Sequence, residues 1–164
     1  MIQPMPMQSP TRVVSAGGYN PSPGAYITTS EFFNFSTLGN SAIFGDMGGN
    51  YYAGQGASNA TRGIVRIGTA APNVGSLLTL QMATLGEAQD FGDSTFPYSH
   101  GDGNSSSTRA VFGGGYNPSN TPSKGDDTIE YVQITTLGNA IDFGNLTRDE
   151  FYAACVSNGH GGLG

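Results

Sequence analysis

TRVVSAGGYNPS at Thr11–Ser22 and TRAVFGGGYNPS at Thr108–Ser119 are two nearly identical phrases in a chain of 164 residues. Each phrase begins with Thr-Arg, continues through a short apolar run, and ends in glycines followed by Tyr-Asn-Pro. A shorter relative, TRGIVRIG, occupies Thr61–Gly68. Self-similarity at a spacing of tens of residues indicates a fold that is built from structural repeats.

Two further phrases follow each Thr-Arg run in the same order. The tripeptide Thr-Leu-Gly is followed, six residues after its leucine, by the phenylalanine of a Phe-Gly-Asp or Phe-Gly-Asn turn. These phenylalanines are Phe44, Phe91 and Phe143. Fifteen residues lead from Asp46 to Thr61, and fifteen again lead from Asp93 to Thr108. Because this spacing is constant, we expect strands that are paired in a fixed register there.

Composition predicts an all-β fold for these repeats. The chain holds 26 glycines and 9 prolines, which favour tight turns over long helices. The net charge is −6 without a basic cluster, which argues against a nucleic-acid partner. No apolar span of membrane-crossing length occurs, so we expect no membrane insertion, and the N-terminus lacks the pattern of a signal peptide.

We expect four short strands in each repeat of about fifty residues. In the third repeat they are predicted at Pro97–Gly101, Arg109–Gly114, Thr128–Thr135 and Ala140–Phe143. The segments between them that vary in length are expected to be exposed loops at one end of the molecule, namely Tyr19–Thr29, Thr69–Ser76 and Tyr116–Asp127. The chain then divides into an N-terminal arm at 1–10 and a repeat domain at 11–164, with repeats at 11–60, 61–107 and 108–158 and a tail at 159–164.

The third repeat resembles the blade of a kelch-type β-propeller. The resemblance rests on the double glycine that ends Val111–Gly114, on the variable loop, and on the Glu130-Tyr131 pair in the following strand. The first repeat matches at Gly17-Gly18, the second has Ile67-Gly68 instead, and the tryptophan usual in kelch blades is absent. The resemblance implies three four-stranded propeller blades.

The order of the strands predicts self-assembly. The first repeat lacks a first strand, whereas FYAACVSN at Phe151–Asn158 aligns with the first strand of the second repeat. Three blades are too few for an ordinary ring, so we expect a homo-oligomer, a dimer or higher, to complete it. The strands Phe151–Val156 and Arg12–Ala16 are expected to meet between chains. The predicted interface residues are Arg12, Val13, Val14, Phe151, Tyr152, Ala154 and Val156.

A narrower resemblance concerns function. The phrases TTLGNAIDFGNLT, TRAVFGGGYNP and CVSNGHGGLG are similar to repeats in kelch-like structural proteins of tailed bacteriophages of aquatic bacteria. The similarity implies a non-enzymatic virion component, a tail fibre or other appendage, that is assembled in the host cytoplasm with other virion proteins. Two alternatives stay open: a cellular propeller that binds protein partners, and a glycan-cleaving enzyme on a propeller scaffold.

Few residues suggest a chemical site, and we predict no catalytic residue, metal or cofactor. The DFGD phrase at Asp90–Asp93 is interpreted as a repeat turn, and the loop around Asp102 lacks the ligand set of a calcium site. Cys155 lies in an apolar run, so we expect a buried thiol. Two aromatic-amide pairs could contact a host surface glycan, or could simply form turns: Tyr19 with Asn20, and Tyr116 with Asn117.

Overall fold

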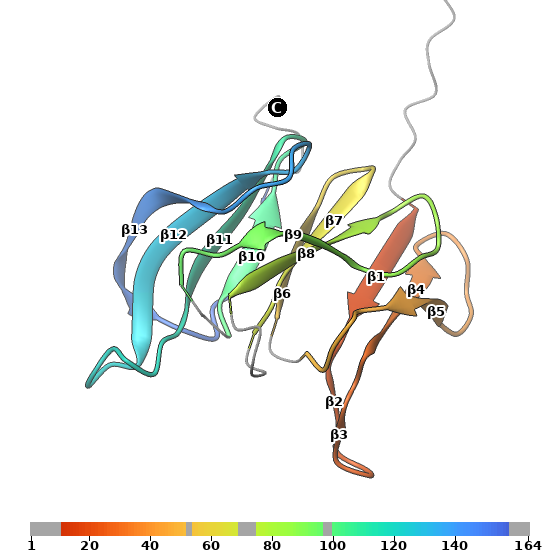
Figure 1. Cartoon of the computed structure of the whole chain (residues 1–164), viewed down its shortest axis with the longest axis horizontal. Coiled ribbons are helices and arrows are strands. Elements are labelled where there is room, and N and C mark those ends of the chain that lie inside the picture. The colour runs from red at the N-terminus through yellow and green to blue at the C-terminus, as the bar shows by residue number, and fades with distance from the viewer. Residues whose placement is uncertain (1–10, 52–53, 69–74, 97–99, 158–164) are drawn as a thin grey trace, which may run out of the picture.

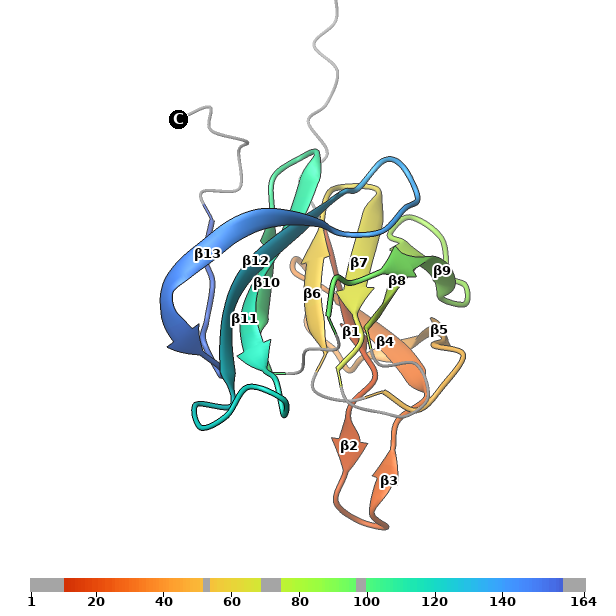
Figure 2. The same ribbon diagram turned by 60° about the vertical axis from the view of Figure 1, so that its left-hand side comes forward.

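The computed structural model describes residues 11–51, 54–68, 75–96 and 100–157. Within these ranges the chain forms thirteen β-strands and no helix, and every paired strand is antiparallel. The predicted all-β class is therefore confirmed. Three larger sheets lie side by side, as Figures 1 and 2 show from two directions.

The first sheet has three strands in the order β1-β4-β5. These strands are β1 (Arg12–Ala16), β4 (Thr29–Asn34) and β5 (Ala42–Asp46). Between β1 and β4 the chain makes a small hairpin from β2 (Tyr19–Asn20) and β3 (Ala25–Tyr26), which projects away from the sheets (Figure 1).

The second and third sheets each have four strands in sequence order. The second sheet consists of β6 (Gln55–Ser58), β7 (Arg62–Arg66), β8 (Ser76–Gln81) and β9 (Gln89–Asp93). The third consists of β10 (Asp102–Ser105), β11 (Arg109–Tyr116), β12 (Gly125–Gln133) and β13 (Ile141–Glu150). Each of the three sheets contains one copy of the repeated phrases, although β6 and β10 belong to the sheet that follows the predicted repeat in which their residues lie. As expected, the first sheet lacks a counterpart of β6 among the described residues.

Several predicted strand boundaries need correction, among them Thr128–Thr135, which is β12 at Gly125–Gln133. The strand predicted at Pro97–Gly101 is β10, which begins at Asp102; residues 97–99 lie outside the described residues. The strand predicted at Ala140–Phe143 continues as β13 to Glu150, because β12 is long enough to pair with it as far as Asp126. Residues 151–157 form no strand, since no strand among the described residues pairs with them.

The glycines of the opening phrase have a conformational role. Gly17 has a φ of +66° and Gly114 a φ of +61°, in the left-handed region that other residues adopt at a cost. A Cβ atom on Gly17 would also lie 2.6 Å from Tyr51 O, and one on Gly114 would lie 2.9 Å from Glu150 O. The glycines therefore let another part of the chain pass directly against the end of β1 and of β11.

Two of the three predicted variable loops are described, and both project at the same end of the molecule (Figures 1 and 2). One contains the β2–β3 hairpin, and the other joins β11 to β12. Residues 69–74, which make up most of the third loop, lie outside the described residues.

Candidate subunit interface

Two contacts between neighbouring sheets organise the molecule. The first junction lies between the first and second sheets and is filled by the cluster of Phe44, Met47, Tyr51, Ile67, Leu78 and Leu80. The second junction lies between the second and third sheets and is filled by Ala57, Ile64, Leu77, Phe91, Ala110, Phe112, Val132 and Ile134. Burying one large apolar side chain contributes roughly 1.5–3 kcal/mol. The hydrophobic core of this protein therefore lies between its sheets.

The same backbone hydrogen bonds recur in both junctions. In each, the outer strand of one sheet accepts two bonds from the turn before the outer strand of the next. The bonds are Gly86 N to Phe44 O (3.1 Å) and Ala88 N to Asp46 O (2.8 Å) in the first junction, and Gly138 N to Phe91 O (2.9 Å) and Ala140 N to Asp93 O (2.7 Å) in the second. By this equivalence a further junction would join the carbonyls of Phe143 and Asn145 to the amides of Gly39 and Ser41.

The arginine of each Thr-Arg pair has an equivalent role. Arg12 Nη1 donates to Met82 O at 2.8 Å across the first junction, and Arg62 Nη1 donates to Ile134 O at 2.8 Å across the second. Arg109 is the third of these arginines, and its side chain is exposed. The counterpart of Met82 and Ile134 in the first sheet is Phe35, so Phe35 O is the acceptor that a further junction would offer to Arg109.

Two phenylalanines lie on the outward ends of the row of sheets. Phe44 and Phe91 are each 3% exposed, whereas their counterpart Phe143 is 54% exposed. Leu80 and Val132 are each 2% exposed, whereas their counterpart Phe33 is 43% exposed. The counterparts of the apolar side chains that fill both junctions are thus exposed at the two ends of the row, where no described sheet covers them.

The end of the third sheet reproduces the face that the first sheet turns toward the second. In the first sheet the Arg12 guanidinium lies 4.7 Å from the centre of the Phe32 ring, which meets Phe44 edge to face at 6.1 Å. In the third sheet Arg109 lies 4.9 Å from the centre of the Tyr131 ring, which meets Phe143 edge to face at 5.8 Å. The first of these faces packs into a junction, with Phe44 buried and Arg12 and Phe32 half-buried, and the second faces outward.

Arg12, Val13 and Val14, the predicted interface residues on β1, line a groove of about 420 Å³. The groove runs between β1, β6 and β7 and reaches Gly103–Ser105 of β10. It lies along the edge of β1 that no strand pairs with among the described residues. β6 and β10 are the first strands of the second and third sheets, and the first sheet has no equivalent strand beside β1 among the described residues. The groove lies at the position of that strand.

The predicted interface residues Phe151, Tyr152, Ala154 and Val156 lie on the other side of β10. Tyr152 N donates to His100 O at 2.6 Å, Cys155 N to an Asp102 carboxylate oxygen, and Ser157 Oγ to Ser105 O at 3.1 Å. Of residues 151–157, all but Phe151 and Ala153 are strongly solvent-accessible, and Val156 is 94% exposed. Within one chain, the structure therefore does not bring these residues together with Arg12–Val14.

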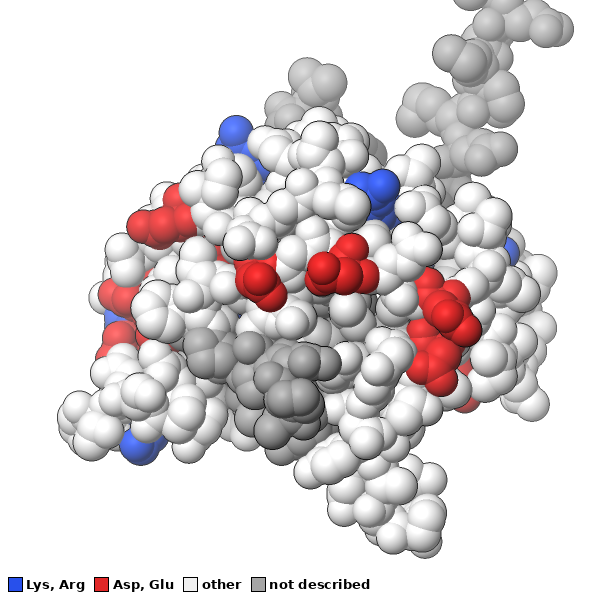
Figure 3. Space-filling view, viewed as in Figure 1, with Lys and Arg blue, Asp and Glu red and all other residues white. Residues whose placement is uncertain are grey.

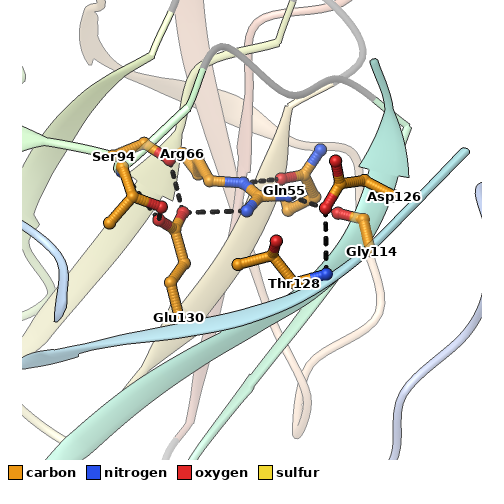
Figure 4. A network of polar contacts seen from close by, with 8 residues as sticks. Gln55, Arg66, Ser94, Gly114, Asp126, Thr128 and Glu130 are labelled. Atoms are coloured by element: carbon orange, nitrogen blue, oxygen red, sulfur yellow. Dashed lines mark hydrogen bonds and ion pairs between the residues drawn. The ribbon is translucent and has the colours of Figure 1, made fainter. Parts of the chain in front are cut away.

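A buried ion pair joins the second and third sheets and was not predicted from the sequence. Arg66 Nη1 donates to Glu130 Oε1 at 2.8 Å, and both side chains are fully buried (Figure 4). Arg66 also donates to Gly114 O at 3.0 Å and to the Gln55 amide oxygen. One signal could have indicated it: Arg66 is a single charge within the apolar run Gly63–Gly68.

The carboxylate of this pair is well supplied with donors. Thr95 donates to Glu130 Oε2 through its backbone N at 2.8 Å and through Oγ1 at 2.6 Å, and Ser94 Oγ donates to Oε1. Burial raises the pKa of Glu130, but the Arg66 charge and these hydrogen bonds together lower it by more, so the pKa lies below its ordinary value of 4.5. The two side chains thus form an ionised pair that links the second and third sheets.

The residues predicted to bind a ligand lie in the two projecting loops. Tyr19 is 54% exposed and meets Tyr26 across the β2–β3 hairpin, with ring centres 5.4 Å apart. Asn20 Oδ1 accepts the Ser22 amide, and Asn117 Oδ1 accepts the Ser119 amide, as in ordinary turns. Tyr116 packs against other aromatic rings, namely His100 at 6.2 Å and Phe151 at 5.8 Å. The structure does not bring the two pairs into one site.

The polar loop at Asp102 and the single cysteine also have defined surroundings. Asp102 uses one carboxylate oxygen for the Gly103 amide and the other for the Cys155 amide. Contrary to the prediction, Cys155 is exposed, because no sheet of the described residues covers the segment that carries it. Across the described ranges, no group of three histidine, cysteine, aspartate or glutamate residues is placed to hold a metal ion.

Comparison with known proteins gives this chain no family. No protein-family model matches it, and no curated protein matches it in sequence. In the described part of the chain, no helix is long and apolar enough to cross a membrane.

Proposed function

We propose that the protein is a non-enzymatic structural subunit of a bacteriophage particle, a tail fibre or other appendage, whose kelch-like propeller blades are completed by self-assembly. The observation that carries the proposal is the outward face formed by Arg109, Tyr131 and Phe143. It repeats the arrangement of Arg12, Phe32 and Phe44, which packs against a neighbouring sheet. A face built to be covered supports a subunit of a larger assembly.

The opposite end of the chain offers a matching surface. Phe33 is the counterpart of Leu80 and Val132, which receive the phenylalanine of the preceding sheet in the two junctions. The amides of Gly39 and Ser41 make no hydrogen bond to another sheet among the described residues. One copy thus carries the acceptor face and the donor face of the same junction, so a second copy is the partner that fits both.

Two copies joined at both ends would form a closed ring of six sheets, within the four to eight blades that are usual for propellers. Closure leaves no exposed apolar end, and it uses each face once per copy. Acidic side chains are spread over the face seen in Figure 3, and the net charge of −6 opposes association at low ionic strength. Assembly should therefore be measured at physiological salt.

The test compares two exposed apolar residues. Phe143→Asp places a charge in the proposed junction, and Leu85→Asp places one at a leucine that is 58% exposed in the turn between β8 and β9. In sedimentation velocity at micromolar concentration, the wild type and Leu85→Asp should be dimers or larger, and Phe143→Asp should be a monomer. A monomeric wild type, or equal behaviour of the two variants, would contradict the assembly.

The place in a phage particle requires its own experiment. Antibody labelling of purified particles should locate the chain on an appendage. If the chain is found inside cells but not on purified particles, the alternative is favoured, namely a cellular propeller that binds protein partners. Contact with host surface glycans is part of the proposal because the Tyr19 and Tyr26 rings are exposed on a projecting hairpin. A glycan array with Tyr19→Ala as the comparison tests it.

A further inference from the structure

The groove along β1 has the position of a missing strand. In the second and third sheets, the strand that pairs with the edge of β7 or β11 is β6 or β10. The corresponding edge of β1 faces the groove of about 420 Å³ instead. An unpaired strand edge beside apolar side chains favours the addition of a further strand.

The segment at 151–157 lies against β10 in the way that β10 lies against β6, which is the position of the first strand of a further sheet. Ser105 Oγ donates to Ser58 O at 2.5 Å, which places β10 against β6. In the same way Ser157 Oγ donates to Ser105 O at 3.1 Å, which places the segment against β10. Ser58, Ser105 and Ser157 are therefore equivalent residues, and residues 151–157 continue the series that β6 and β10 begin.

The segment has no pairing strand of its own. β6 pairs with β7 and β10 with β11, whereas no strand pairs with residues 151–157 within the described chain. In the described chain the segment hydrogen-bonds to β10 and does not line the groove beside β1, so one copy does not join the two. A second copy, placed as proposed above, brings its β1 next to the segment.

We infer that residues 151–157 of one copy fill the groove of a second copy as the first strand of its first sheet. This inference rests on the proposed assembly. The registers of the other two sheets fix the alignment: Gln55 lies opposite Arg66, and Asp102 lies opposite Gly113. The same register sets Ala154 opposite Ala16, Cys155 opposite Ser15, and Val156 opposite Val14 of the second copy. A valine that is 94% exposed in one chain thereby packs against another valine.

The single cysteine makes the register testable in the full chain. Ser15→Cys would place a thiol directly opposite Cys155 of the other copy, within the range that a disulfide spans. Held in this way, the two thiols have an effective concentration in the millimolar range, roughly a hundredfold or more above that of micromolar protein. Partial burial of the sulfur and the nearby carboxylates of Asp102 and Glu150 raise the pKa of Cys155, so oxidation by oxidised glutathione should be run at mildly alkaline pH.

Two matched controls accompany this variant: Ser119→Cys on the exposed β11–β12 loop, and Ser15→Cys combined with Cys155→Ser. Covalent dimer on a non-reducing gel should form about a hundredfold faster with Ser15→Cys than with either control. If Ser15→Cys cross-links no faster than Ser119→Cys while sedimentation still shows a dimer, the inference fails and the assembly stands. If the Ser15→Cys variant stays a monomer but loses both free thiols, Cys155 has bonded to the new cysteine within one chain, and the inference is also overturned.

Discussion

The first and second junctions use the same backbone bonds but different side chains. Arg66 and Glu130 form the buried ion pair of the second junction, and their counterparts in the first are Ala16 and Leu78. Because both junctions keep the arginine-to-carbonyl bond and the two turn bonds, the repeat defines the backbone geometry. The interior side chains are then free to vary, and a charged pair in only one junction distinguishes that contact from the other.

The largest expected effect comes from breaking the ion pair. Arg66→Met leaves the Glu130 carboxylate buried without its counter-ion, which should lower the free energy of unfolding by about 3–5 kcal/mol. For comparison, Arg12→Met in the first junction, where no charged pair stands at the equivalent positions, removes one half-buried hydrogen bond and should cost about 1–2 kcal/mol. Denaturant unfolding at one fixed protein concentration measures both. Equal costs would mean that the charged pair adds nothing to the second junction.

A second comparison isolates the close approach of two backbones. Gly92 and Gly144 are equivalent bulge glycines with φ values of +147° and +140°. A Cβ on Gly92 would lie 2.4 Å from Gly138 O, whereas a Cβ on Gly144 would have nothing within 4 Å. Alanine at either position has the same unfavourable φ, so Gly92→Ala should cost about 1–3 kcal/mol more than Gly144→Ala.

This difference is measured by denaturant unfolding of both variants under conditions where the protein is a monomer. In the proposed dimer the counterpart of Gly138 is Gly39 of the second copy, so Gly144→Ala should additionally weaken association. A Gly144→Ala variant that associates as tightly as the wild type would show that no sheet approaches Gly144 as the third sheet approaches Gly92.

The repeated phrases were sufficient to predict the three sheets, their strand order and the first strand that the first sheet lacks. The fifteen-residue step from Asp93 to Thr108 also contains the position of β10, although the strand was predicted a few residues too early. The ion pair could not be predicted in this way. Arg66 and Glu130 are 64 residues apart, and only the packing of two sheets brings them together. The exposed thiol of Cys155 likewise depends on which sheets cover it, which local sequence does not specify.

The smallest expected effect is the dependence of stability on pH. Glu130 has a lowered pKa in the folded protein, so its ionised form contributes stability above pH 4.5, and this contribution is lost as the pH falls through the lowered value. Each unit of lowering corresponds to about 1.4 kcal/mol. Glu130→Gln cannot titrate, so the difference in unfolding free energy between wild type and variant should shrink as the pH falls below 4.5. A difference that stays constant between pH 6 and pH 3 would show that Glu130 is not the group that couples the second junction to acid.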